Sequence, residues 1–66
     1  MSLQSRLIQL RSERGLSQRE LASLTGIGRR TIERIERYVT PTVPVLGKLA
    51  IFYGITLSTL FKGVDS

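Results

Sequence analysis

The most constraining feature of this sequence is a three-residue turn, Gly26-Ile27-Gly28, between two short segments with helical periodicity. The first segment opens at Ser17-Gln18-Arg19-Glu20, a capping box whose end residues satisfy each other's free backbone N–H groups. The second runs from Arg29 to about Arg37. Gly26 provides the left-handed backbone conformation of the turn, and Ile27 is expected to plug the core beneath it. Two short helices joined by such a glycine-containing turn form a helix-turn-helix unit.

One helical segment precedes this unit and another follows it. The first runs from about Leu3 to Arg14 and ends at Gly15, a residue type that commonly closes helices. In the other, Thr42 is expected to cap the helix. Pro44 lies in its first turn, where the missing N–H costs nothing, and the segment ends at Gly54.

Thr56 is expected to cap a last short helix, from Leu57 to about Lys62, which ends at Gly63. Strand signals are weak, because the chain has no Asn-Gly or Asp-Gly turn and no clean period-two alternation. The sequence therefore predicts an all-α fold of five helices in a single domain, 1–66, with its helix-turn-helix core at about 17–37. The side chains expected to face inward are Leu3, Leu7, Leu10, Leu21, Leu24, Ile27, Ile32, Ile35, Leu46, Leu49 and Ala50.

Composition argues against several classes of function. The 66 residues include no cysteine and no histidine, which removes thiolate nucleophiles, imidazole bases, disulfides and the usual soft-metal ligands. The glutamates all lie in helical pairing or capping positions, so no nucleophile–base pair is expected. We therefore expect no enzymatic activity, no metal and no cofactor. We also expect no small-molecule ligand, since the sequence predicts a single domain and no separate ligand-binding domain.

No membrane or export signal is predicted. The longest uncharged stretch, Leu49 to Phe61, is too short and too polar to span a membrane. Residues 1–3 do not resemble the start of a signal peptide. Together with the absence of cysteine, these patterns favour a cytoplasmic protein.

Positive charge is concentrated in the first half of the chain. Ten Lys+Arg stand against five Asp+Glu, which gives a net charge of +5, and every arginine lies between Arg6 and Arg37. Arginine in excess of lysine favours bidentate contacts to phosphate or guanine. The alternative is a merely basic surface.

The segment from residue 29 to 37 separates its charged and apolar side chains. On a projection of about 100° per residue, Ile32 and Ile35 share one face. The opposite face carries, within an arc of about 140°, Arg29, Arg30, Glu33, Arg34 and Arg37.

This arginine face is electrostatically unfavourable for folding alone. Arg29 and Arg30 lie in the first turn, where the helix dipole disfavours cations by about 0.3–1 kcal/mol each. Arg30 and Arg34 are like charges one turn apart. An anionic partner would remove both penalties. The alternative is a solvated face on which Glu33 pairs with Arg37 or Arg29.

The stretch from Leu16 to Glu36, LSQRELA through GIGRRTIERIE, resembles the lambda-repressor-like (Cro/CI, or XRE) helix-turn-helix family. The similarity continues in register at Pro41-Thr42, Leu49-Ala50, Gly54-Ile55 and Leu60, so it covers nearly the whole chain. The resemblance implies a compact five-helix domain. Its third helix, the recognition helix, would enter the major groove of double-stranded DNA while the second helix bridges the backbone.

The resemblance also implies residue roles. Arg29, Arg30 and Arg34 match base-reading positions and would favour guanine, and the chemistry of Glu33 would suit a cytosine N4 amine. Gln18 matches a residue that contacts phosphate and buttresses the recognition helix, and the loop before the fourth helix matches a second phosphate contact. Arg11 and Glu36 match a pair that forms an inter-helix salt bridge. The predicted phosphate contacts are Gln18, Arg37, Thr40, Thr42 and Val43.

Several positions depart from the family pattern. Gly28 stands where the family prefers Ser or Thr, and Tyr38 replaces its usual glycine after the recognition helix, where the loop is also one residue short. Ile8, Ile51 and Phe52 are apolar where relatives are often polar. We expect them to fill the core, and the alternative is a protein interface.

These features predict a sequence-specific transcriptional regulator, a repressor of phage or other mobile-element type. It would bind a pseudo-palindromic operator as a homodimer, with half-sites about one helical turn apart. The candidate dimer surface is formed by Leu57, Phe61 and Val64. The alternative is an antitoxin-like partner-binding module, which an exposed apolar patch around Ile51, Phe52, Phe61 and Val64 would favour.

Overall fold

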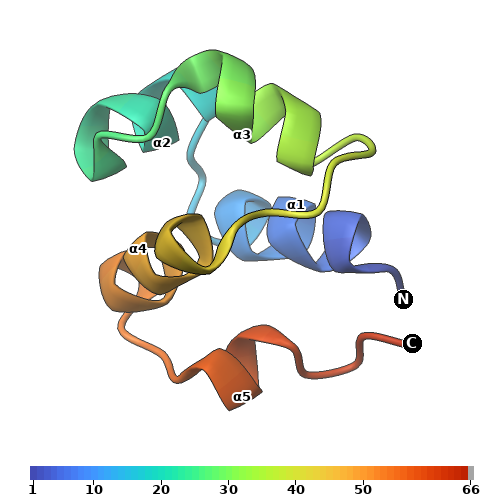
Figure 1. Cartoon of the computed structure of the whole chain (residues 1–66). Helices are drawn as coiled ribbons and strands as arrows, with labels where there is room; N and C mark the ends of the chain where they lie inside the picture. The colour runs from blue at the N-terminus through green and yellow to red at the C-terminus, as the bar shows by residue number, and fades with distance from the viewer. Residues whose placement is uncertain (66) are drawn as a thin grey trace.

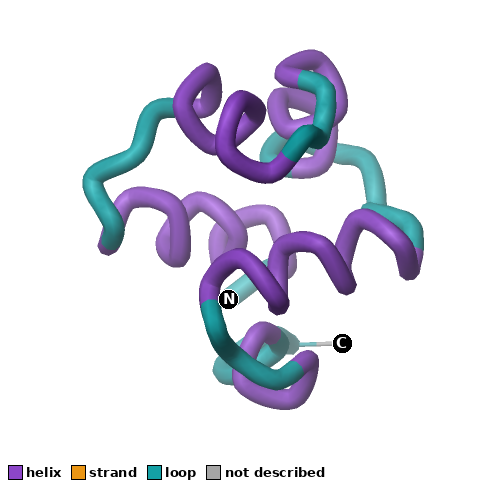
Figure 2. Tube along the Cα trace, turned by 90° about the vertical axis from the view of Figure 1, so that its left-hand side faces the viewer, coloured by secondary structure: helices purple, strands orange, loops and turns teal. Residues whose placement is uncertain are grey.

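The computed structural model describes residues 1–65 and contains five α-helices and no strand in that range. Figure 1 shows α2 and α3 together at the top of the molecule, α1 and α4 below them, and α5 beneath α4. The tube in Figure 2 shows the same three levels from the side. The predicted all-α, five-helix fold is confirmed. The helices are α1 (Leu3–Glu13), α2 (Gln18–Thr25), α3 (Arg29–Ile35), α4 (Val43–Tyr53) and α5 (Leu57–Leu60).

Local side-chain signals set most of the helix ends. Ser17 and Glu20 form the predicted capping box: the Ser17 amide donates to Glu20 Oε1 at 2.9 Å, and the Glu20 amide donates to Ser17 Oγ at 3.0 Å. The hydrogen bond from the Ser17 amide to the carboxylate is the main cause that lowers the pKa of Glu20. Thr56 caps α5 as predicted, and Gly26 ends α2 with a φ of 75°. Both ends of α2 therefore follow from local chemistry.

Two helix ends differ in detail from the prediction. Thr42 is the N-cap residue of α4 as predicted, but its side chain makes no capping hydrogen bond. Pro44 is the second residue of α4 and has no N–H, which removes one of the two amides that a cap normally accepts from. The last helix stops at Leu60 rather than near Lys62, and residues 61–63 form a turn.

The core draws on every helix. It consists of Leu7, Leu10, Leu21, Ile27, Ile32, Ile35, Leu49, Ala50, Tyr53 and Leu60, with Leu3 and Leu46 packed against it. Leu24 was predicted to face inward, and this was wrong, since it is 60% exposed. In α2 the inward stripe is instead formed by Leu21, Ala22 and Thr25, whose hydroxyl donates to the Leu21 carbonyl at 2.7 Å.

Arg6 of α1 and Arg14, the residue that follows α1, hold the fold together, which the sequence did not reveal. Arg6 is buried, and its guanidinium donates to the carbonyls of Leu60 at 2.9 Å and Thr59 at 2.7 Å at the end of α5. Arg14 lies 4.4 Å from the centroid of the Tyr53 ring and donates to the Tyr53 carbonyl at 3.3 Å. The cluster of arginines in the sequence thus divides into structural and exposed members. No helix within residues 1–65 has the length and apolar character to cross a bilayer.

Tyr53 makes the stability of the domain sensitive to alkaline pH. It is 7% exposed, and burial raises its pKa to about 12, with Glu36 acting in the same direction. An unfolded tyrosine ionises near pH 10. Because the folded pKa is the higher one, the stabilisation is fully present below about pH 10 and is lost as pH rises toward about 12.

We therefore expect the melting temperature of the wild type to fall more steeply between pH 9 and pH 11 than that of Tyr53→Phe. Circular dichroism melts of both proteins at pH 7, 9 and 11 measure this difference. Equal losses in the two proteins would show that Tyr53 ionisation is not coupled to folding.

Candidate nucleic-acid interface

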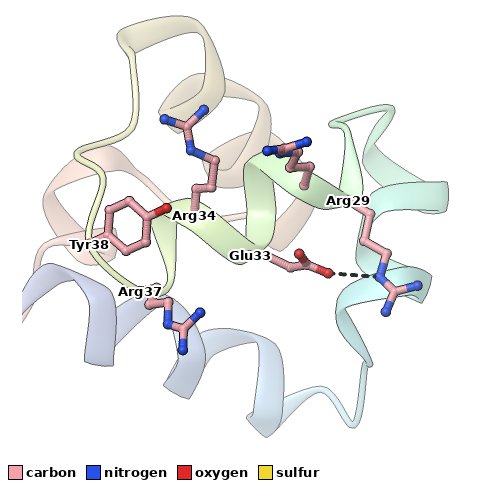
Figure 3. A pocket seen from close by; sticks show the side chains of 6 residues that line it. Arg29, Glu33, Arg34, Arg37 and Tyr38 are labelled. Atoms are coloured by element: carbon pink, nitrogen blue, oxygen red, sulfur yellow. Dashed lines mark ion pairs between the residues drawn. The ribbon is translucent and has the colours of Figure 1, made fainter.

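The exposed side of α3 carries the cluster of charge that the helical projection predicts. Ile32 and Ile35 are buried on one side of the helix, with Ile32 at 0% exposure. The other side borders an open hollow, shown in Figure 3. The hollow is lined by Arg29, Arg30, Glu33, Arg34, Arg37 and Tyr38.

The recognition helix is shorter than predicted and ends at Ile35 rather than at about Arg37. The carbonyl of Arg34 accepts hydrogen bonds from three successive amides, those of Arg37 at 3.2 Å, Tyr38 at 2.9 Å and Val39 at 2.9 Å. No residue other than glycine within 1–65 has a positive φ, so this exit requires no glycine. Arg37 therefore lies in a turn but still lines the hollow.

Glu33 is paired in the free protein. Its carboxylate lies 3.2 Å from Arg29 Nε, one turn away, and both side chains are about half exposed. An exposed pair of this kind contributes only about 0.2–1 kcal/mol. Within residues 1–65, Arg30, Arg34 and Arg37 make no ion pair. The face is therefore strongly positive, and its one carboxylate is held by a weak bond.

Behind this face, Glu36 joins three helices. Its side chain is only 4% exposed and accepts from Arg11 Nε and Nη2, each at 2.9 Å, and from Gln18 Nε2 at 3.1 Å. The hydrogen bonds from Arg11 to Glu36 raise the pKa of the Arg11 guanidinium, against the effect of its burial. Arg11 also donates to the Leu16 carbonyl at 2.8 Å. The network fixes the end of α3 against α1 and the start of α2.

The remaining predicted phosphate contacts lie elsewhere on the surface. Gln18 borders a second hollow together with Arg11, Glu33, Glu36, Arg37 and Ile8. Thr40, Thr42 and Val43 are exposed where the loop enters α4 and do not line the hollow beside α3. The structure thus brings Gln18 and Arg37 together and leaves the other three apart from them.

The apolar departures from the family pattern divide into two groups. Phe52 packs against the core, as expected. Ile8 and Ile51 were expected in the core, and this was wrong, since both are exposed and Ile51 reaches 83%. Ile51 faces solvent because its neighbours Leu49, Ala50 and Tyr53 supply the inward side of α4. On the candidate dimer surface, Leu57 and Phe61 are exposed and Val64 is half-buried.

Tyr38 is the one residue of the hollow that sequence reasoning did not place there. It is 66% exposed and borders the hollow together with the arginines. Its signal in the sequence was present, because it stands where the family usually has glycine.

Comparison with known proteins identifies the family. The family model described as Helix-turn-helix matches residues 7–60. The HTH-type transcriptional regulator PuuR of Escherichia coli (strain K12) is 42% identical over 58 residues, which are 86% of this chain and 31% of that protein. The HTH-type transcriptional regulator DdrOP3 of Deinococcus deserti is 39% identical over 66 residues, 98% of this chain and 51% of that protein.

The chain thus spans about a third to a half of the length of these relatives. The matched region contains α2, the turn and α3 entirely, together with the Arg11–Glu36 pair. The chain belongs to the Cro/CI/XRE-type helix-turn-helix family.

Proposed function

We propose that this chain binds double-stranded DNA and regulates transcription, with α3 placed in the major groove. The observation that carries the proposal is the arginine-lined hollow beside α3, backed by buried Ile32 and Ile35. The major groove is about 12 Å wide and admits one α-helix. A positive helix face whose reverse side is anchored in the core matches that shape and charge.

In this proposal the residues of the face divide by role. Arg29, Arg30 and Arg34 read guanine through its O6 and N7 atoms, and Glu33 accepts from a cytosine amine. Glu33 must first release Arg29, which costs little because that pair is exposed. The phosphate contacts are Gln18, Arg37, Thr40, Thr42 and Val43.

We further propose a homodimer that represses transcription by occupying a pseudo-palindromic operator, in a phage or mobile-element setting in the cytoplasm. Leu57 and Phe61 are exposed apolar side chains suited to a self-complementary contact. Two protomers related by a twofold axis would read half-sites about 34–36 Å apart.

A second candidate function follows from Ile51, whose 83% exposure leaves a large apolar side chain in solvent. An antitoxin-like module would cover such a residue with a partner protein. Co-purification of a second polypeptide with the wild type, and its loss from Ile51→Asp, would favour this function over the repressor.

Selection of bound duplexes from a random DNA pool tests the main proposal. We expect a guanine-containing motif repeated with inverted symmetry, with the two copies about 10–10.5 base pairs apart. Recovery of single, unpaired motifs would contradict the dimer. Failure to enrich any motif would contradict sequence-specific binding. A pool of single-stranded DNA is the matched control and is expected to yield no motif.

A further inference from the structure

The geometry points to Tyr38 as a DNA-contacting residue of this chain: we propose that its phenol hydroxyl donates a hydrogen bond to a backbone phosphate at the edge of the major groove. The inference rests on the proposed DNA-binding function. It concerns a tyrosine at a position where the family usually has glycine.

The backbone holds Tyr38 in a fixed place beside the reading face. Its amide donates to the Arg34 carbonyl at 2.9 Å, and the next amide, that of Val39, donates to the same oxygen at 2.9 Å. Gln4 of α1 donates to the Val39 carbonyl at 3.5 Å from the other side. Tyrosine has only two side-chain torsions, so on a fixed backbone its ring has few orientations. Binding therefore costs little side-chain entropy.

The side chain is exposed toward the hollow instead of packing on the core. Figure 3 shows the ring at the end of α3, between the side chains of Arg34 and Arg37. The ring is 66% exposed, and within residues 1–65 its hydroxyl makes no hydrogen bond meeting ordinary distance and angle limits. A phenol in this state has an apolar body beside the protein and a donor available for a partner.

Position along α3 selects phosphate rather than a base as the partner. In helix-turn-helix proteins the first residues of the recognition helix reach the base edges. Ile35, where α3 ends, lies about 9 Å along the axis from Arg29, and Tyr38 lies beyond it. The major groove is only about 8.5 Å deep. A side chain past the helix end therefore meets the sugar–phosphate wall, where Arg37 supplies the neighbouring positive charge.

Tyr38→Phe removes only the hydroxyl and tests the contact directly. We expect binding to weaken about three- to tenfold, the effect of one hydrogen bond, both on a selected duplex and on a duplex of scrambled sequence. Because phenol is uncharged, the dependence of affinity on salt should not change, whereas Arg37→Gln should lower the log–log slope by about 0.9 per contact. Fluorescence anisotropy with labelled duplexes at 50–200 mM salt measures both quantities.

The other tyrosine provides the matched control. Tyr53→Phe makes the same chemical change in the core, away from the hollow, and should leave affinity unchanged at pH 7. Circular dichroism melts should show that Tyr38→Phe is as stable as the wild type, since the lost hydroxyl bonds nothing within residues 1–65.

Each of the following outcomes would overturn the inference. If Tyr38→Phe binds as tightly as the wild type, the hydroxyl makes no contact with the DNA. If only Tyr38→Ala loses affinity, the ring and not the hydroxyl contacts the DNA. A loss on the selected duplex alone would indicate a base contact. If the wild type binds neither duplex, the proposed function fails together with the inference. Failure of the proposed function is thus distinguished from failure of the Tyr38 contact, because it is seen with the wild type alone.

Discussion

Replacing Glu36 with alanine is expected to lower the free energy of unfolding by about 3–5 kcal/mol, because it leaves the partly buried Arg11 guanidinium without its counter-charge. Glu36 is itself 4% exposed and accepts from both Arg11 and Gln18. A domain of 66 residues has a total stability of only about 3–10 kcal/mol. Glu36→Ala should therefore be largely unfolded near 37 °C, as measured by urea and thermal denaturation.

The matched control for this substitution is Glu33→Ala, the same change one turn earlier in α3. Glu33 pairs with Arg29 at the surface, so its loss should cost at most about 1 kcal/mol. The double variant Arg11→Met, Glu36→Leu removes both charges together and should recover much of the lost stability. If Glu36→Ala melts like Glu33→Ala, the network does not stabilise the fold.

The network also explains why a carboxylate is tolerated at the C-terminal end of a helix. The dipole of α3 disfavours negative charge at Glu36, which caps its last turn. Arg11 and Gln18 outweigh that effect by direct hydrogen bonds from two other helices. The recognition helix is thus aligned by a residue that a free helix would not favour.

Features that depend on neighbours in the sequence could be predicted from it. The capping box at Ser17 and Glu20 and the left-handed Gly26 are local, and the structure contains both. The charged face of α3 follows from helical periodicity alone. Arg11 and Glu36 are distant in sequence, and only the resemblance to a known family brought them together.

Features that depend on packing between distant segments could not be predicted. Periodicity identified an apolar stripe on α2, but the way α3 and α4 pack against α2 decides that Leu21 is covered and Leu24 is not. The same reason leaves Ile51 in solvent. Arg6 appears as one more basic residue until α5 places the carbonyls of Thr59 and Leu60 beside it.

The end of α3 shows a similar limit at the site itself. The helical periodicity of the sequence predicts a helix up to about Arg37. In the structure the carbonyl of Arg34 accepts from three amides, and the helix ends at Ile35. Sequence alone offers no residue that marks this stop, since the usual glycine is absent. Because α3 ends at Ile35, Tyr38 lies in the following turn and borders the hollow.

Arg34→Ala is expected to weaken binding to the selected operator by about 1–3 kcal/mol and to relax the preference at one base pair. Arg34 lies on the exposed face of α3 and makes no ion pair within residues 1–65, so its guanidinium has no internal partner to leave. Loss of a bidentate contact to guanine removes both affinity and discrimination. Anisotropy titrations against the selected duplex and single-base variants measure the two effects separately.

Lys48→Ala removes the same charge from α4, outside the hollow, and controls for the general loss of positive charge. Because Lys48 does not line the hollow, we expect the affinity of Lys48→Ala at 150 mM salt to be close to that of the wild type. If Arg34→Ala weakens every duplex by the same factor, Arg34 contacts phosphate and not a base. Base reading would then fall to Arg29 and Arg30 at the start of α3, where the recognition helix enters the groove most deeply.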